Sequence, residues 1–243
     1  GVFPEGFFAT TNLPTFVRRG GEWIAVHYPE MDCAIVDENG TAITVPLNEV
    51  RKDQAVVVGQ SGVKVEPLER PRSPSHMFQF MGSSVSSEKP KGLVIQEVAE
   101  RIRQAKARGG KVLVVAGPAV IHVGARGYMA RLINSGRVDY LFAGNGMATH
   151  DIECNFFGTS LGIPLDGGAA PEAGHEHHLR AINRIRAAGG IRPAVEKGIL
   201  TDGVMYSCVK HGVDYVLAGS IRDDGPLPDV ITDALQAQAE MRN

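Results

Sequence analysis

Cysteine is scarce in this sequence, which has only three in 243 residues, at Cys33, Cys154 and Cys208. They lie far apart and none belongs to a CxxC pair, which excludes a cysteine-based zinc site and fits a reducing compartment. We therefore expect a cytoplasmic protein. No base partner for Cys154 or Cys208 is visible in the sequence, so both are interpreted as small core residues.

A charge excess is also absent, because the formal net charge is −2 at pH 7. That balance gives no indication of binding to nucleic acid or to an anionic membrane. No apolar stretch approaches the length of a transmembrane helix, and no signal peptide is visible. The hydrophobic share of 43% and the charged share of 21% are ordinary for a soluble globular protein of one large or two small domains.

The fingerprints of metal and dinucleotide sites are missing as well. There is no HExxH pattern, and the histidines of segment 175–178 stand at adjacent or alternate positions that do not share one helical face. No metal site is therefore expected. His177 and His178 are candidates for the edge of an active site, or else they are residues that enter a helix. No GxGxxG pattern is present, so a dinucleotide site must be argued from other features.

Three short apolar runs that end in Ala-Gly are the most informative feature present. They cover residues 111–117, 139–144 and 214–219, and each is typical of a buried parallel strand. Parallel strands bring their carboxyl ends to one edge of a sheet, where open α/β sheets bind ligands. We predict one binding edge made by Gly117, Gly144-Asn145 and Gly219-Ser220. The alternative is that Ala-Gly merely ends strands, as in any α/β protein.

The predicted fold class is α/β, with a small β-rich N-terminal module before a Rossmann-like, mostly parallel domain. Residues 1–70 alternate short apolar runs with turns, and Asn39-Gly40 is a strong hairpin signal, so a small barrel or sandwich is expected. Residues 71–92 are rich in proline and serine and are interpreted as a linker. From residue 93 strands alternate with helices, which predicts right-handed crossovers and a sheet covered on both faces.

The two ends of the α/β part are also informative. Ile95, Val98 and Ile102 form the apolar stripe of its first helix. The last residues, 231–243, are typical of a helix, and in an α/β fold such a helix normally leads to another strand. Because the sequence also begins at Gly1 rather than at Met, we expect it to be a fragment that lacks residues at one or both ends. The terminal helix indicates that the domain of residues 93–243 is incomplete at its C-terminus.

Two strand ends carry candidate cofactor contacts. Gly117 and Pro118 open a helix directly after a strand, and free N–H groups at such a turn suit a phosphate or a carboxylate. Asn145 follows the next strand, and its amide both donates and accepts, which suits a ribose or a carboxamide. The alternatives are an ordinary strand-to-helix turn at Gly117 and, at Asn145, a residue chosen because it tolerates left-handed backbone.

The run from Asp223 to Asp229 is the most unusual in the chain. Asp223 and Asp224 leave a strand end, and Asp229 arrives after a stiff Pro-Leu-Pro spacer. Carboxylates in such a place accept ribose hydroxyls, bind a substrate ammonium group or act as a general base. Asp229 is equally suited to be the N-cap of the last helix.

Longer motifs resemble the family named for the LOR/SDH conserved region. That family includes archaeal-type ornithine cyclodeaminases and the C-terminal part of bifunctional arginine dihydrolase/ornithine cyclodeaminases. The resemblance covers essentially the whole chain. The motifs that carry it are residues 1–12 (GVFPEGFFATTN), 30–36 (EMDCAIV), 86–90 (SSEKP), 174–183 (GHEHHLRAIN) and 218–229 (AGSIRDDGPLPD).

The resemblance implies an NAD-dependent lyase that converts L-ornithine to L-proline with loss of ammonia. It implies cofactor contacts at Asn145, Gly146 and Asp224, to which the strand-end argument adds Gly117, Pro118 and Ser220. The candidates for the catalytic base and for binding the substrate amines are Asp223, Asp229, His177 and His178. Family members extend further at both ends, so a second chain that supplies the rest of the nucleotide-binding domain is one possible partner, and a homo-oligomer is expected.

Two other function classes stay open on the sequence. One is an NAD-binding subunit or regulatory domain without turnover of its own. The other is a related NAD-using enzyme that acts on another amino acid or on a polyamine.

Overall fold

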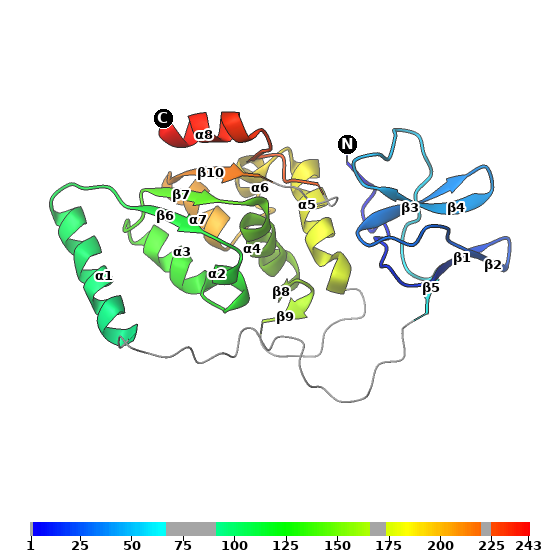
Figure 1. Cartoon of the computed structure of the whole chain (residues 1–243), viewed down its shortest axis with the longest axis horizontal. Helices are drawn as coiled ribbons and strands as arrows, with labels where there is room; N and C mark the ends of the chain where they lie inside the picture. Colours follow the sequence, from blue (N-terminus) through cyan, green and yellow to red (C-terminus); the bar gives the residue numbers. More distant parts are fainter. Residues whose placement is uncertain (1, 67–90, 166–173, 220–224) are drawn as a thin grey trace.

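The computed structural model describes residues 2–66, 91–165, 174–219 and 225–243, which form an antiparallel β module and a parallel α/β domain (Figure 1). The predicted fold class is therefore confirmed. Nearly all of the predicted linker, residues 71–92, falls in the segment 67–90, which lies outside the described residues. Within the described part, no helix has both the length and the apolar composition needed to cross a bilayer.

The N-terminal module consists of two small antiparallel sheets. One has the order β2-β1-β5, and the other is the hairpin β3-β4. Asn39 and Gly40 form the hairpin turn with φ angles of 52° and 90°, the left-handed pair that a tight two-residue turn requires. Residues 55–58, one of the short apolar runs, form only isolated bridges through Val56 and Val58. The strands are β1 (Thr15–Arg19), β2 (Glu22–Ala25), β3 (Cys33–Glu38), β4 (Thr41–Pro46) and β5 (Val63–Val65).

The α/β domain is built on a parallel sheet of order β11-β10-β7-β6. Two short helices, α2 and α3, follow β6, and the last helix begins three residues later than predicted, after the short strand β11. The elements in chain order are α1 (Lys91–Ala107), β6 (Leu113–Ala116), α2 (Ala119–His122), α3 (Arg126–Asn134), β7 (Tyr140–Ala143), α4 (Asn145–Phe157), β8 (Thr159–Ser160), β9 (Ile163–Pro164), the 3-10 turn η2 (Gly174–Glu176), α5 (His177–Ala188), α6 (Ile191–Glu196), α7 (Val204–His211), β10 (Asp214–Ala218), β11 (Val230–Ile231) and α8 (Ala234–Arg242).

One face of this sheet is covered and the other is largely bare. Helices α3, α4 and α7 lie below the sheet in Figure 1, where Val114, Leu141 and Leu217 join the main core. On the opposite face α8 lies over β10 and β11, whereas Val115 in β6 is 76% exposed. The prediction of a sheet covered on both faces is therefore wrong at β6 and β7 for the described residues, because consecutive crossovers put their helices on the same face.

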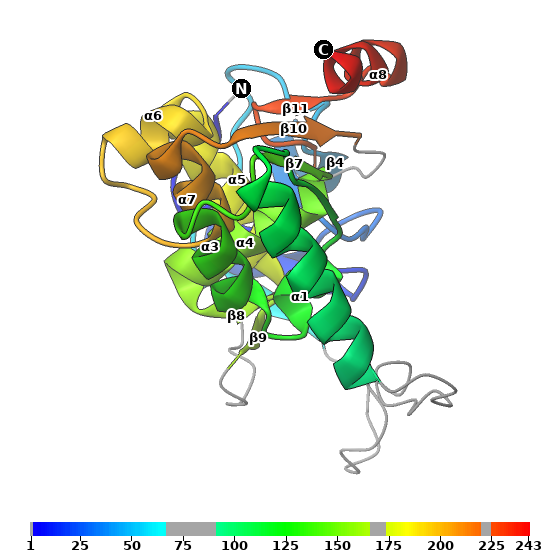
Figure 2. The same cartoon turned by 90° about the vertical axis from the view of Figure 1, so that its left-hand side faces the viewer.

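Helix α1 lies at the end of the domain farthest from the N-terminal module (Figures 1 and 2). Its predicted apolar stripe is not buried, since Ile95 is 67% exposed and Val98 is also exposed. The helix is held at its C-terminal end by Lys106, whose Nζ lies 2.8 Å from the carboxylate of Asp139. The same carboxylate accepts the N–H of Val112, just before β6, at 2.8 Å. Asp139 thus ties α1 to the start of β6.

A buried ion pair joins three helices of the main core. Asp151 of α4 is fully buried, and its carboxylate receives Nε of Arg126 at 2.8 Å from the start of α3. It also accepts the N–H groups of Val204 and Met205, which are the first two residues of α7. Gly203 has a φ of 112°, and a Cβ atom there would collide with both side chains of the pair.

Helix α5 lies between the module and the rest of the α/β domain and packs against both (Figure 1). Leu179 packs in the core of the module, whereas Ile182 and Ile185 pack in the core of the α/β domain. Asn183 clamps the N-terminal segment, because its amide accepts the N–H of Phe3 at 2.8 Å and donates to the carbonyl of Phe3 at 3.0 Å. The module is therefore docked by shared apolar packing and by a two-point backbone contact.

The clamp predicts a stability change for Asn183→Ala. The substitution leaves both backbone groups of Phe3 without their partner, so we expect the free energy of unfolding to fall by about 1–3 kcal/mol. Urea denaturation followed by circular dichroism measures this. Asn134→Ala, at the exposed end of α3, is the matched control and should change stability by less than about 0.5 kcal/mol. Equal effects of the two substitutions would show that the hydrogen bonds from Asn183 to Phe3 do not stabilise the fold.

Asp139 predicts a pH dependence of stability. Lys106, with the N–H of Val112 and with Lys111, lowers the pKa of Asp139 from 3.8 to about 2. A carboxylate with a depressed pKa in the folded state stabilises the fold above its unfolded value, and this contribution is lost as the pH falls through about 2. Between pH 4 and 2, roughly the range set by these values, the wild type should lose more stability than Asp139→Asn. Asp214→Asn, at the exposed start of β10, is the control that should follow the wild type.

Candidate functional site

Three parallel strands end side by side, as the Ala-Gly runs predicted. Strand pairing sets Ala143 of β7 opposite both Ala116 of β6 and Leu217 of β10, so the residues that follow share one edge of the sheet. At this edge a Cβ atom on Gly146 would lie 3.9 Å from the ring of Pro118, which makes these two candidate cofactor residues neighbours. The predicted common edge, including Gly117, is confirmed, whereas its use by a ligand stays a prediction.

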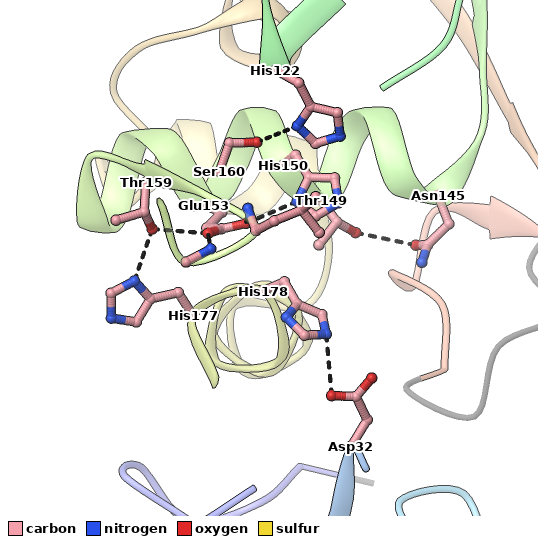
Figure 3. Close-up of polar contacts among 12 residues, drawn as sticks. Asp32, His122, Asn145, Thr149, His150, Glu153, Thr159, Ser160, His177 and His178 are labelled. Carbon is pink, nitrogen blue, oxygen red and sulfur yellow. Dashed lines mark hydrogen bonds and ion pairs between the residues drawn. The ribbon is translucent and has the colours of Figure 1, made fainter. Parts of the chain in front are cut away.

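Asn145 is the first residue of α4 and is almost completely buried at this edge. Its side-chain oxygen accepts the N–H of Leu227 at 2.9 Å and lies 3.4 Å from the hydroxyl of Thr149 (Figure 3). The amide therefore holds the segment after β10 against the start of α4. Its Nδ2 has no hydrogen-bond partner in the part of the chain that the structure describes.

The acidic run after β10 is only partly described. Ser220, Asp223 and Asp224 lie outside the described residues, so their proposed roles stay predictions. Asp229 is described, and its carboxylate accepts the N–H of Ile191 at 2.9 Å, at the start of α6.

Asp229 is therefore engaged in the fold. Tyr215 also reaches its carboxylate, at 3.4 Å, and burial raises the pKa of Asp229. The cap predicted for the last helix is supplied instead by Asp233, which accepts the N–H of Gln236 at 2.7 Å. These contacts favour a structural role for Asp229, and its catalytic role stays a prediction.

His177 and His178 open α5 and point to different partners (Figure 3). Nδ1 of His177 lies 2.8 Å from the hydroxyl of Thr159, and its ring stacks on Phe157 at 4.5 Å. Nε2 of His178 lies 3.7 Å from the carboxylate of Asp32, which belongs to the N-terminal module. The module therefore contributes a charged group to the surroundings of the candidate site.

A cluster of histidines that the sequence did not reveal includes His178. Its centre is His150 of α4, whose ring lies 4.9 Å from that of His122 at the end of α2 and 6.3 Å from that of His178 (Figure 3). Three histidines from three helices thus form a row. The spacing His150-x-x-Glu153 on one helix was the available signal, but the contribution of His122 arises only from the fold.

Glu153 is the fully buried acid of this cluster. Its carboxylate receives Nδ1 of His150 at 2.8 Å and the hydroxyl of Thr159 at 2.8 Å. It also accepts two backbone N–H groups of the β8–β9 turn, from Leu161 at 3.1 Å and from Gly162 at 2.8 Å. Burial raises the pKa of Glu153, but the hydrogen bonds outweigh burial and the pKa lies below its ordinary value. Glu153 is therefore ionised at neutral pH.

His122 completes the row as a neutral group. Its Nδ1 lies 2.7 Å from the hydroxyl of Ser160, in the same hairpin that surrounds Glu153. Burial, together with the proximity of His150, lowers the pKa of His122 below its ordinary value. A neutral histidine accepts or donates a proton through one nitrogen at a time, so the site joins an ionised acid to imidazoles suited to proton transfer.

Comparison with known proteins identifies the family. Residues 96–243 match the model described as arginine dihydrolase ArgZ-like, C-terminal, Rossmann fold, and residues 14–95 match the model of the first region of the same C-terminal part. Ornithine cyclodeaminases from Methanothermobacter thermautotrophicus and Methanopyrus kandleri are 55% and 57% identical over 99% and 100% of this chain. The chain spans 59% of the length of each of these curated relatives.

A solved structure gives the same relationship in three dimensions. The crystal structure of the ternary complex of AgrE with ornithine and NAD⁺ superposes with a TM-score of 0.83 at 43% identity. It covers 98% of this chain, which corresponds to 33% of the AgrE chain. The resemblance inferred from the sequence motifs is confirmed, and the chain belongs to the family of ArgZ-like C-terminal regions, whose second part has the Rossmann fold.

Proposed function

We propose that this chain is part of an NAD-dependent ornithine cyclodeaminase, a lyase that converts L-ornithine to L-proline and ammonia. The observation that carries the proposal is the similarity, over nearly the whole chain, to a protein whose structure holds ornithine and NAD⁺. Relatives named ornithine cyclodeaminase that are more than half identical support the same reaction.

The residues at the sheet edge fit a dinucleotide. Helix α4 begins directly after Gly144 with no side-chain cap and no acidic residue in its first turn, so its N–H groups suit a phosphate. Gly117, Pro118 and Gly146 present little side-chain bulk there, and Nδ2 of Asn145 supplies a donor. With Ser220 and Asp224, these residues are the proposed contacts for NAD, which when bound supplies a reversible hydride acceptor.

The substrate is an amino acid with two ammonium groups, and the chain's own residues must bind these groups and remove protons from them. We propose His178, held near Asp32, and His177, held by Thr159, for the substrate side of the edge. Asp223 remains a candidate to bind an ammonium group. Buried imidazoles beside ionised carboxylates are suited to general acid–base steps near neutral pH.

We also propose that the bare part of the sheet receives the rest of the nucleotide-binding domain. Within the described residues β6 pairs with β7 alone, and its outer face exposes Leu113 and Val115. An unpaired edge with an apolar face favours addition of further strands, and doubly wound nucleotide sites are built from two halves. Further length of the same polypeptide or a second chain would supply them, and a homo-oligomer remains our expectation.

The alternative function is an NAD-binding domain without turnover of its own. The uncovered sheet face favours it for the chain in isolation, because hydride transfer requires a shielded site. A related NAD-using enzyme acting on another amino acid or on a polyamine is the other alternative. All three cysteines are buried and form no disulfide within the described residues, which fits our proposal of a cytoplasmic location.

Asn145 gives a test of the cofactor proposal. In the full-length protein, Asn145→Ala should weaken NAD binding by about 1–3 kcal/mol, measured by calorimetry, because it removes the proposed buried hydrogen bond to the ligand. Asn145→Asp keeps an oxygen for the N–H of Leu227 but places a negative charge near the phosphates. It should therefore also weaken binding while hydrogen exchange at Leu227 stays slow. Asp224→Ala should weaken binding by a similar amount. Unchanged affinity in all three variants would refute the assignment.

Proline formation from ornithine tests the activity and the need for further strands. Residues 1–243 alone should form little or no proline with NAD present, because part of the cofactor pocket is open to water. A version extended at the C-terminus to the length of the archaeal relatives, or a mixture with that segment as a separate chain, should restore both NAD binding and turnover. Comparable turnover by residues 1–243 alone would contradict the need for more strands, and no turnover by the extended version would refute the proposed reaction.

A further inference from the structure

We infer that Glu153 is the positioning residue of a proton-accepting site whose acceptor is Nε2 of His150. The role of the site in catalysis rests on the proposed function, whereas the role of Glu153 rests on geometry alone. Neither residue was a candidate from the sequence. The hydrogen-bond network of Figure 3 fixes which atoms of these side chains donate and which accept.

The donors around Glu153 fix its protonation state. Four donors surround its two oxygens, namely His150 and Leu161 at Oε2, and Thr159 and Gly162 at Oε1. The backbone N–H groups donate without alternative, and one of them reaches each oxygen. A proton on either oxygen would compete with these donors, so the carboxylate is ionised and accepts every bond.

The ionised Glu153 in turn fixes the tautomer of His150. Because Glu153 accepts, the 2.8 Å contact requires that Nδ1 of His150 carries the hydrogen. In its neutral form an imidazole has one N–H, so with the hydrogen on Nδ1 the lone pair of that form lies on Nε2. Within the described residues no hydrogen-bond partner occupies Nε2. His150 is thus oriented as a base, in the arrangement by which a carboxylate orients a catalytic histidine in other enzymes.

Glu153 also sets the tautomer of His177, through the hydroxyl of Thr159. The hydroxyl of Thr159 has one hydrogen, which it gives to Glu153 at 2.8 Å. It must therefore accept at its second contact, so Nδ1 of His177 is also the protonated nitrogen. One buried carboxylate sets the tautomer of two histidines on different helices, directly for His150 and through a hydroxyl for His177.

The surroundings of His150 match the task of deprotonating an ammonium group. His122 from α2 and His178 from α5 flank its ring, and His178 in turn faces Asp32. Glu153 is the charged group in direct contact with the ring. When a substrate ammonium gives its proton to Nε2, an N–H bond of the substrate breaks and the electron pair stays on the substrate nitrogen. The positive charge moves to His150, where Glu153 stabilises it.

Ring nitrogen NMR tests the positioning role without any substrate. In the wild-type chain at neutral pH, long-range ¹H–¹⁵N spectra should show His150 and His177 as Nδ1–H tautomers. Glu153→Gln should turn both into mixtures, and Thr159→Val, which keeps the side-chain shape, should alter His177 alone. Glu196→Gln, on the exposed side of α6, is the matched control and should alter neither. A wild-type His150 with hydrogen on Nε2 would overturn the inference, and Thr159→Val still decides the network if Glu153→Gln does not fold.

Kinetic measurements on the version extended at the C-terminus test whether Nε2 of His150 accepts the proton. His150→Gln should lower kcat for proline formation about 100-fold or more, the usual weight of a general base, with a smaller effect on KM for ornithine. Glu153→Gln should lower kcat and alter the pH profile of kcat, which a purely structural loss would not do. If the wild type turns over and His150→Gln is equally fast, the acceptor role is overturned although the proposed function stands. If the wild type does not turn over, the proposed function fails and the acceptor role falls with it.

Discussion

The structure depends on two carboxylates buried in a single helix. Asp151 and Glu153 of α4 are both completely inaccessible to solvent, and a buried charge is tolerated only where donors surround it. Asp151 is satisfied by Arg126 and by the start of α7, and Glu153 by His150 and the β8–β9 turn. Because the donors come from segments far apart in the chain, helix α4 fixes the positions of its neighbours on two sides.

This arrangement connects the cofactor edge to the proton-handling cluster. Asn145 begins α4 at the end of β7, and Glu153 lies about two turns further along the same helix. Their separation is therefore set by a regular helix whose position the Asp151 ion pair fixes. Rigid elements hold functional groups more accurately than loops do, which suits a reaction that must align two ligands.

Local signals in the sequence predicted the local parts of this structure. The Ala-Gly strand ends and the Asn39-Gly40 hairpin follow from short-range patterns, and the structure has both. The apolar stripe of α1 lies on a helix, as predicted, but Ile95 and Val98 are exposed among the described residues. Burial is a property of tertiary contacts, so periodicity alone could not say which apolar faces stay exposed.

The site was harder to predict than the fold, for a physical reason. His122 and His150 are 28 positions apart (150 − 122) and meet only because α2 and α4 are adjacent. Asp229 looked like a helix cap or a base, yet it binds the start of α6, which lies earlier in the chain. Contacts of this kind depend on three-dimensional neighbours that have no signature in the sequence between them.

Helix α5 has a consequence for how this architecture can be divided. Its Leu179 side packs with Phe7 and Leu47 of the module, while Ile182 and Ile185 pack in the other core. A cut placed in the linker would therefore separate the module from a helix that forms part of its own interior. Transfer of the module to another protein, by design or during evolution, would therefore require transfer of α5 as well.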